Sequence, residues 1–216
     1  MNTPVEVPTQ VLSLPPGEMV NLSRRRFLVG ATAGALVLGF GLPLGASRVH
    51  AATATTAERG TQVPAFLEIR PDGTVRLLCP FMEGGQGTYT AMAQIVGEEL
   101  DADPATFLVD SAPPGEAYVV MENGLRITGG SMSVRMSYPT MRRLGALARA
   151  MLLQAAAEQL GVPLSELSSE PGKVVHAASG RALPYGALAE RAMDLPVPDP
   201  TRVKPVSYTH LRAHET

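Results

Sequence analysis

Residues 65–79 read AFLEIRPDGTVRLLC, two runs of β-forming residues that flank the turn sequence Pro71-Asp72-Gly73-Thr74. An Asp-Gly pair between such runs favours a tight turn, because glycine adopts the positive φ that such turns require. The pattern therefore predicts a β-hairpin with strands over 65–69 and 75–79. The rest of the fold is built outward from this hairpin.

Helical and extended patterns alternate after the hairpin. Apolar residues recur at helical spacing in two long stretches, and the second of these stops at Gly161. The expected elements are a helix at 88–100, a strand at 107–109, a helix at 138–160, short extended pieces at 166–167 and 174–176, and a helix at 185–193. Mixed strands and helices with short connections predict an α/β domain of mixed α+β type, with two layers and the helices packed on one face of a sheet.

The N-terminal segment differs from this body. SRRRFL at residues 23–28 precedes a mildly apolar run with five glycines and then Val49-His50-Ala51. This order is typical of a twin-arginine signal peptide over residues 1–51, and the glycines make the apolar run only weakly helical. The alternative is an uncut membrane anchor, because about 20 residues can span a bilayer. We expect export to the periplasm, with membrane association only through an uncut leader.

The C-terminal segment differs as well. VSYTHLRAHET at residues 206–216 follows a proline-rich linker at 196–205 and shares no periodicity with the residues before it. One choice of codons for it matches a transposase adapter used in sequencing libraries. We expect an artefact rather than an authentic polar tail, so the domain is truncated. With a linker at 52–61, the segment left to fold is 62–195.

Composition excludes several classes of function. Residues 52–205 carry 13 Lys+Arg and 17 Asp+Glu, a net charge of -4 that argues against nucleic-acid binding. The only cysteine is Cys79 and the only histidine in this body is His176, so the chain cannot itself hold a zinc site or an iron–sulfur cluster. Cys79 is expected to be a small buried apolar residue, and His176 a surface or capping residue.

The residues that could carry chemistry lie in two glycine-rich junctions, each just before a helix. The first is EGGQGT at residues 83–88. Its glycines let the backbone approach a ligand closely, and the free N–H groups at the helix start favour an anion such as a phosphate. The alternative is a tight turn with Thr88 as N-cap. Glu83 is expected to accept hydrogen bonds within the loop rather than to act as an acid or base.

The second junction is TGGS at residues 128–131. It precedes the long helix, and the alternative interpretation is a loop with a serine cap. Arg135, which follows this junction, could pair with a cofactor phosphate. Arg142 and Arg143 lie within the helix and are expected on its solvated face.

Taken in this order, the two junctions resemble the molybdopterin-binding large subunit of the xanthine dehydrogenase family, most closely its isoquinoline 1-oxidoreductase beta-subunit branch. The hairpin, the stretch GQGTYT at 85–90 and the second junction all fit that branch. Gly84 and Met132 depart from the residues usual there. The resemblance covers nearly all of 62–205, which is only the start of a subunit that is normally several times longer.

The resemblance implies roles for particular residues. Gln86 would lie near molybdenum and hydrogen-bond its apical oxo ligand, as a neutral amide donor can do without titrating. The other residues expected to bind the molybdopterin-type cofactor are Gly85, Gly87, Thr88, Gly129, Gly130 and Ser131. No residue of this chain is expected to ligate the metal. The family's glutamate base lies near the C-terminus of the full subunit, so this fragment alone is expected to be inactive.

The resemblance also implies an activity. The full enzyme would hydroxylate an electron-poor carbon of an N-heterocycle or aldehyde with oxygen from water. Electrons would pass to a small [2Fe-2S] partner subunit, with a cytochrome as a further candidate acceptor. An alternative of another class is an exported, non-enzymatic α/β module that binds an anionic ligand through the same glycine loops.

Overall fold

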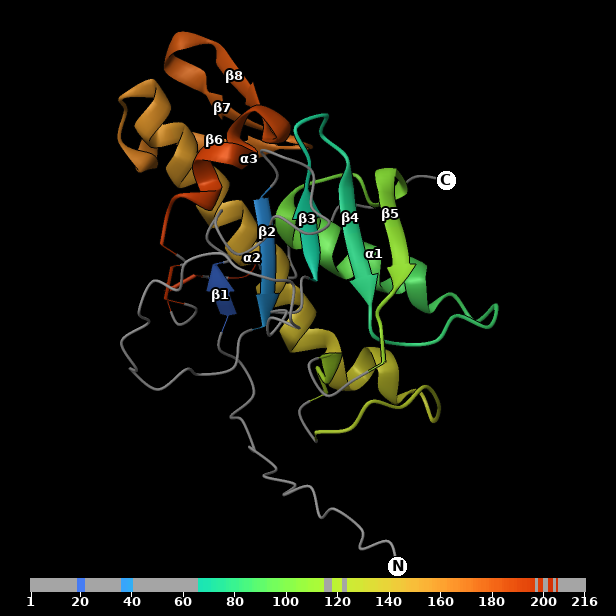
Figure 1. Cartoon of the computed structure of the whole chain (residues 1–216). Coiled ribbons are helices and arrows are strands. Elements are labelled where there is room, and N and C mark those ends of the chain that lie inside the picture. Colours follow the sequence, from blue (N-terminus) through green and yellow to red (C-terminus); the bar gives the residue numbers. More distant parts are fainter. Residues whose placement is uncertain are drawn as a thin grey trace, which may run out of the picture.

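The computed structural model describes residues 19–21, 36–40, 66–114, 118–121, 124–196, 198–199, 202–203 and 205. Its larger sheet has the strand order β1-β2-β3-β4-β5 (Figure 1). These strands are Met19–Asn21, Leu36–Phe40, Leu67–Ile69, Val75–Cys79 and Phe107–Ser111. Neighbouring strands are antiparallel except β4 and β5, which are parallel, so the carboxyl ends of β4 and β5 lie at the same edge of the sheet.

The hairpin expected from the sequence is the β3–β4 pair. Leu67 pairs with Leu77, and the turn is closed by a hydrogen bond from Arg70 N to Thr74 O of 2.9 Å. Gly73 has φ 87°, a positive value that glycine adopts readily and that the Asp-Gly turn requires. Alternate β4 residues Val75, Leu77 and Cys79 are buried in the core. The prediction of the hairpin is confirmed.

Helices α1 (Thr88–Leu100) and α2 (Met132–Leu160) pack against each other and cover one face of the larger sheet (Figure 1). They approach each other closely at Gly145, where an added Cβ would lie 2.4 Å from the carbonyl oxygen of Val96. Only glycine permits this approach. The predicted two-layer α/β arrangement, with helices on one face of a sheet, is confirmed.

A smaller antiparallel sheet follows α2. It has the order β6-β7-β8, formed by Leu167–Glu170, Lys173–His176 and Arg181–Pro184. Helix α3 (Tyr185–Met193) packs on α2. Short 3₁₀ turns span Pro104–Thr106, Leu164–Glu166 and Ala177–Ser179. The buried side chains of both sheets and all three helices form one apolar core.

Two element predictions differ from the structure. Helix α2 begins at Met132 rather than at residue 138, so Pro139 lies inside the helix instead of at its start. Proline is typical of a first helical turn, which made a later start plausible. Within the predicted leader, Leu36–Phe40 forms a strand paired with β3 and not a weak helix. The glycines of this segment disfavour a helix, and its backbone forms hydrogen bonds with β3 instead.

Two side chains also differ from expectation. Arg142 is not on a solvated face, because its Nη2 lies 2.5 Å from Oε1 of the buried Glu99 on α1. His176 is 7% exposed and so not a surface residue, but it is the N-cap residue of the 3₁₀ turn Ala177–Ser179, without a side-chain cap hydrogen bond. Its ring nitrogens contact Ser179 Oγ at 2.7 Å and Glu166 Oε2 at 3.0 Å. Cys79 is buried as predicted, and burial raises the pKa of its thiol to about 11.

Several sequence predictions fall on residues that the structure does not describe. The linker at 52–61, the tail at 206–216 and most of the predicted leader lie outside the described ranges. Within those ranges, none of the helices has the length and apolar character needed to cross a bilayer. The same ranges contain no group of three or more His, Cys, Asp or Glu residues that could ligate a metal ion.

Candidate functional site

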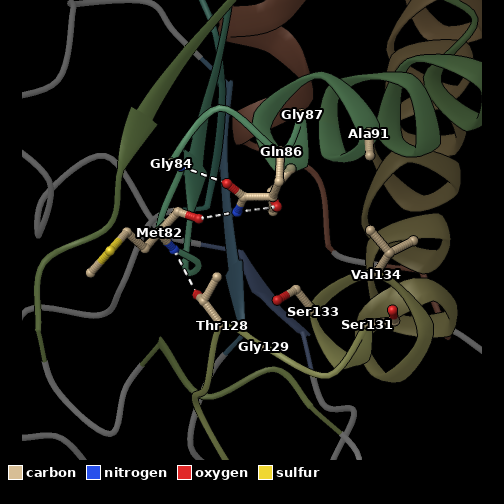
Figure 2. Close-up of a pocket in the computed structure, with 11 residues that line it drawn as sticks. Met82, Gly84, Gln86, Gly87, Ala91, Thr128, Gly129, Ser131, Ser133 and Val134 are labelled. Carbon is tan, nitrogen blue, oxygen red and sulfur yellow. Dashed lines mark hydrogen bonds between the residues drawn. The ribbon is translucent and has the colours of Figure 1, made fainter.

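The two glycine junctions, far apart in the sequence, line one pocket of about 540 Å³ (Figure 2). Its lining residues are Met82 just before the first junction, Gly84, Gln86, Gly87 and Thr88 of that junction, Ala91 of α1, Thr128, Gly129 and Ser131 of the second junction, and Ser133 and Val134 of α2. Met82 N donates a hydrogen bond of 2.9 Å to Thr128 Oγ1, which joins the two junctions directly.

Five of the seven residues predicted for the site line this pocket. The remaining two, Gly85 and Gly130, are not among its lining residues. Both have positive φ, 93° for Gly85 and 57° for Gly130, so they shape the backbone of the two junctions. Arg135 is exposed in the first turn of α2 and does not line the pocket.

The Gln86 side chain is held within its own loop. Its Oε1 accepts from Gly84 N at 2.6 Å, while its Nε2 donates to Met82 O at 2.7 Å and to Thr88 Oγ1 at 2.8 Å. The backbone partners fix the amide orientation, because an N–H must face an oxygen and a C=O must face a donor. Both Nε2 hydrogens are therefore engaged. A ligand at this position would have to take one from Thr88 or Met82.

Glu83 organises the same loop. Its carboxylate accepts from the backbone N–H groups of Gly85 at 2.7 Å, Gly87 at 3.1 Å and Tyr89 at 2.9 Å. The hydrogen bond from Tyr89, followed by those from Gly87 and Gly85, holds the pKa of Glu83 below its ordinary value. Glu83 is thus a loop-stabilising acceptor, as the sequence predicts.

These contacts change where an anion would bind. The phosphate interpretation of the first junction required free N–H groups at the start of α1, yet Glu83 already occupies that helix start. Thr88 is not the N-cap either, since that residue is Gly87, and the Thr88 hydroxyl accepts from Gln86 instead. The first junction is therefore closed by its own carboxylate.

The start of α2 has the opposite character. Its N-cap Ser131 lies in the left-handed region at φ 56°, makes no side-chain cap hydrogen bond, and is followed by a first turn without acidic residues. The helix that begins there has 29 residues, and its N-terminal turn, including Ser133 and Val134, faces the pocket (Figure 2). A long helix presents partial positive charge at such an end. The second junction is thus better suited to an anionic group.

Sequence reasoning missed several pocket residues. Met82, Ala91, Ser133 and Val134 line the pocket without belonging to the predicted set. Met82 and Val134 are unusually exposed for apolar residues, at 72% and 36%. Their positions close to the glycine junctions in the sequence could have indicated them. The packing of α1 against α2, which brings Ala91 and Val134 to the same pocket, could not be seen in the sequence.

A family of molybdopterin cofactor-binding domains matches residues 18–215. This chain belongs to that family. It is 36% identical over 180 residues to the isoquinoline 1-oxidoreductase subunit beta of Brevundimonas diminuta, and 27% identical over 175 residues to the membrane-bound aldehyde dehydrogenase [pyrroloquinoline-quinone] of Gluconacetobacter polyoxogenes. These alignments cover 79% and 81% of this chain but 22% of either relative. The resemblance inferred from the two junctions is confirmed at the level of the family.

Among solved structures, the chain is similar to a Cu,Mo-CO dehydrogenase in the carbon monoxide-reduced state, with a TM-score of 0.46 and 22% identity. That match covers 57% of this chain and 15% of the dehydrogenase chain. The chain thus spans less than a quarter of the length of each of these proteins.

The pocket fits a cofactor of this class. Its volume lies within the range of about 300–1,000 Å³ usual for cofactor sites. At Gly87 and Gly129, an added Cβ would meet no heavy atom within 4 Å, so both glycines leave open space at the pocket wall. Amide and hydroxyl groups from Gln86, Thr88 and Ser131 supply neutral hydrogen-bonding partners around that space.

Proposed function

We propose that this chain is part of the catalytic subunit of an exported molybdenum hydroxylase or dehydrogenase. The observation that carries the proposal is the meeting of the two glycine junctions at one pocket, in a chain of the molybdopterin cofactor-binding family. Neither junction alone distinguishes a cofactor site from an ordinary turn. Their convergence gives a concave surface with backbone and side-chain donors on both sides.

The chain's residues would divide the binding task. The start of α2, with Gly129 and Ser131, would hold an anionic part of the cofactor, because its first turn has no side-chain cap and no acidic side chain, although Met132 N donates to Gly129 O. The Gly84–Gly87 loop would face the cofactor from the opposite wall. Its shape is fixed in advance by Glu83, so little loop ordering would remain to oppose binding.

Gln86 would orient toward the reactive end of the cofactor and donate one Nε2 hydrogen to it. Because both hydrogens are engaged within the loop, donation requires the exchange of one partner. The Thr88 hydroxyl is the simpler partner to release, since it can rotate and act as a donor itself. When bound, a molybdenum cofactor supplies the redox chemistry that introduces oxygen from water into an electron-poor carbon.

The proposed substrates are N-heterocycles or aldehydes. The names of the two relatives support this class, since one acts on isoquinoline and the other on an aldehyde. We further propose a small [2Fe-2S] partner subunit as electron acceptor, with a cytochrome as a further candidate. A single cysteine gives this chain no means to hold an iron–sulfur cluster itself, which supports a separate redox subunit.

The test uses the complete gene, expressed with its partner subunits. We expect purified enzyme to contain molybdenum and pterin, and to oxidise isoquinoline or an aliphatic aldehyde with an artificial electron acceptor. In ¹⁸O-labelled water, the product should carry the label. A purified full-length protein that binds phosphate or another anion, but contains no molybdenum when produced in a molybdenum-replete host, would instead support the non-enzymatic anion-binding module.

Export is a separate proposal, supported by the SRRRFL motif at 23–28 and the Val49-His50-Ala51 sequence. Replacing Arg24 and Arg25 with Lys should abolish arrival in the periplasm, because the twin-arginine pair is the feature read by the translocase. Cleavage after Ala51 would also remove β1 and β2 from the edge of β3. N-terminal sequencing of the exported form should therefore start at Ala52, and unchanged periplasmic arrival of the double variant would contradict the proposal.

A further inference from the structure

Arg126 connects the segments that form the two walls of the pocket, although it does not line the pocket itself. Its guanidinium donates to three backbone carbonyls: from Nε to Pro80 O at 2.6 Å, from Nη1 to Pro113 O at 2.5 Å, and from Nη2 to Ala112 O at 2.8 Å. The three acceptors belong to two different loops. One planar group thus joins these two loops to the segment that carries Arg126.

These loops have defined places in the fold. Pro80 directly follows β4, and Ala112 directly follows β5, so both lie at the carboxyl ends of the two parallel strands. Ala112 N also donates to Cys79 O at 2.7 Å, which ties the two strand ends together. Ligand sites commonly lie beyond the carboxyl ends of neighbouring parallel strands. Arg126 occupies this edge of the sheet.

Arg126 also lies two residues before Thr128, and Pro80 lies two residues before Met82. The Met82–Thr128 and Arg126–Pro80 hydrogen bonds are therefore two links between the same two segments, each two residues from the other along both. The Tyr118 ring supports the guanidinium, whose carbon is 5.8 Å from the ring centroid. Within the described residues, the hydrogen-bond partners recorded for this side chain are all carbonyl oxygens.

We propose that Arg126 is a positioning residue for the cofactor pocket. It holds the segment that carries Thr128 and Gly129 against the segment that carries Met82 and the Gly84–Gly87 loop. This inference rests on the proposed function, because the pocket it positions is the proposed cofactor site. A lysine could reach one of the three carbonyls but could not reproduce the planar fork, so Arg126→Lys keeps the charge and removes the connection.

The experiment uses full-length enzyme with its partner subunits, and compares Arg126→Lys with wild type. The matched control is Arg191→Lys, because Arg191 on α3 uses two guanidinium nitrogens, Nε and Nη2, both directed to Glu158 on α2. The measurements are molybdenum and pterin per folded protein, the rate of cofactor release after dilution, and the melting temperature of the cofactor-free form. We expect Arg126→Lys to speed release by about 10- to 100-fold, as for other residues that support a site without touching its ligand.

A purely structural role predicts a different outcome. In that case, Arg126→Lys would lower the melting temperature of the cofactor-free form more than Arg191→Lys does, and folded molecules would release cofactor at the wild-type rate. That result, or unchanged release with unchanged stability, would overturn the proposal. Absence of cofactor from the wild type would overturn the proposed function instead.

A double-substitution cycle provides the second test, and it remains informative if Arg126→Lys folds poorly. Thr128→Val removes the neighbouring link between the same two segments. If both hydrogen bonds act by holding the two segments together, loss of one bond removes most of the effect of the other. The double variant should then release cofactor more slowly than the product of the two single-variant increases in release rate predicts. Strictly multiplicative effects would contradict positioning through the Thr128 segment. Arg126→Gln replaces Arg126→Lys in the cycle if the lysine variant is insoluble.

Discussion

The two glycine junctions look alike in the sequence but differ in how their backbone donors are used. At the first, Glu83 accepts three backbone N–H groups at the start of α1, and Gln86 is fixed by its own loop. At the second, the start of α2 has neither a side-chain cap nor an acidic residue in its first turn. Glycines before a helix therefore mark a possible anion site only where nearby side chains leave the donors available.

Under the proposed function, this difference would give the two walls of the pocket separate tasks. The first junction, fixed by its own hydrogen bonds, would present the neutral amide of Gln86 to the cofactor. The second would present the partial positive charge of a helix start. Substitutions in the first junction should therefore lower turnover more than they lower the amount of bound cofactor. Substitutions in the second junction should mainly lower the amount of bound anionic cofactor.

The largest effect is expected at Gln86. In the full-length enzyme, Gln86→Ala should lower kcat by about a hundredfold or more while molybdenum stays bound, because loss of one preorganised donor typically costs about 3–4 kcal/mol of transition-state stabilisation. Gln94→Ala is the matched control, since Gln94 is exposed on α1 away from the pocket lining. Steady-state kinetics with metal analysis separates the two effects.

Gln86→Glu sharpens the same test. A carboxylate keeps an acceptor for Gly84 N but places an oxygen against Met82 O, where the amide donates. We expect reduced turnover here as well. Wild-type turnover in both variants, with molybdenum present, would mean that the first junction is only a turn.

The second largest effect is expected at Gly145, where α2 packs against α1. An added Cβ at Gly145 would lie 2.4 Å from Val96 O and 2.8 Å from the Glu99 Cβ, so Gly145→Ala must push α1 and α2 apart. Overpacking of this kind typically costs about 1–3 kcal/mol. Helix propensity alone predicts the opposite sign, a gain of up to about 1 kcal/mol for alanine over glycine.

Thermal unfolding of the cofactor-free subunit distinguishes these two signs. The control is Ala150→Gly on the same helix, which should destabilise by about 1 kcal/mol through propensity alone. If Gly145→Ala is neutral or stabilising, the close approach of the two helices is not required. Cofactor content should fall with Gly145→Ala, because both walls of the pocket move with their helices.

A third and smaller effect is expected at the second junction. Ser131→Asp places a carboxylate at the uncapped start of α2, in a left-handed conformation that Asp and Asn tolerate. It should stabilise the cofactor-free domain by about 0.5–1 kcal/mol through capping and the helix dipole. The same charge should repel an anionic cofactor and lower its retention.

Ser131→Asn separates charge from capping in this test. The amide can cap the helix but carries no charge, so it should stabilise without lowering molybdenum content. Equal loss of cofactor in both variants would show that side-chain size at Ser131 matters, and not the anionic character of the ligand.

The sequence predicted the local elements better than their lateral contacts. The hairpin, α1 and α3 could be placed because they depend on neighbouring residues, through an Asp-Gly turn and apolar periodicity, and the end of α2 because Gly161 stops that helix. The start of α2 was placed six residues too late, because Pro139 is compatible with a first turn as well as with an interior one.

Contacts between distant segments could not be predicted from local patterns. Arg142 was expected in solvent because a charged residue on a helix usually lies there, but α1 presents the buried Glu99 directly opposite. The sequence predicted that Glu83 accepts hydrogen bonds within the first junction. That its carboxylate reaches the N–H groups at the start of α1, which leaves the start of α2 as the place proposed for an anion, depends on distances that only the fold provides.

The smallest effect is a pH dependence at Glu83, which tests the closed state of the first junction. Hydrogen bonds from Tyr89, Gly87 and Gly85 lower the pKa of this carboxyl in the folded chain. A folded-state pKa below the unfolded one means that the ionised group stabilises the fold above the ordinary pKa of 4.5, and that this contribution is lost as the pH falls through the folded value. Glu83→Gln removes the ionisation.

The melting temperature of wild type should therefore exceed that of Glu83→Gln at pH 6–7, and the two should converge as the pH falls below about 4.5. Glu170→Gln, at an exposed carboxylate on β6, is the control for general acid effects. Hydrogen exchange of the peptide covering residues 83–89 gives the local readout, because the N–H groups of Gly87 and Tyr89 lose their charged acceptor in the variant. If exchange there is unchanged, other groups hold the first junction, and the contrast between the two junctions does not originate in Glu83.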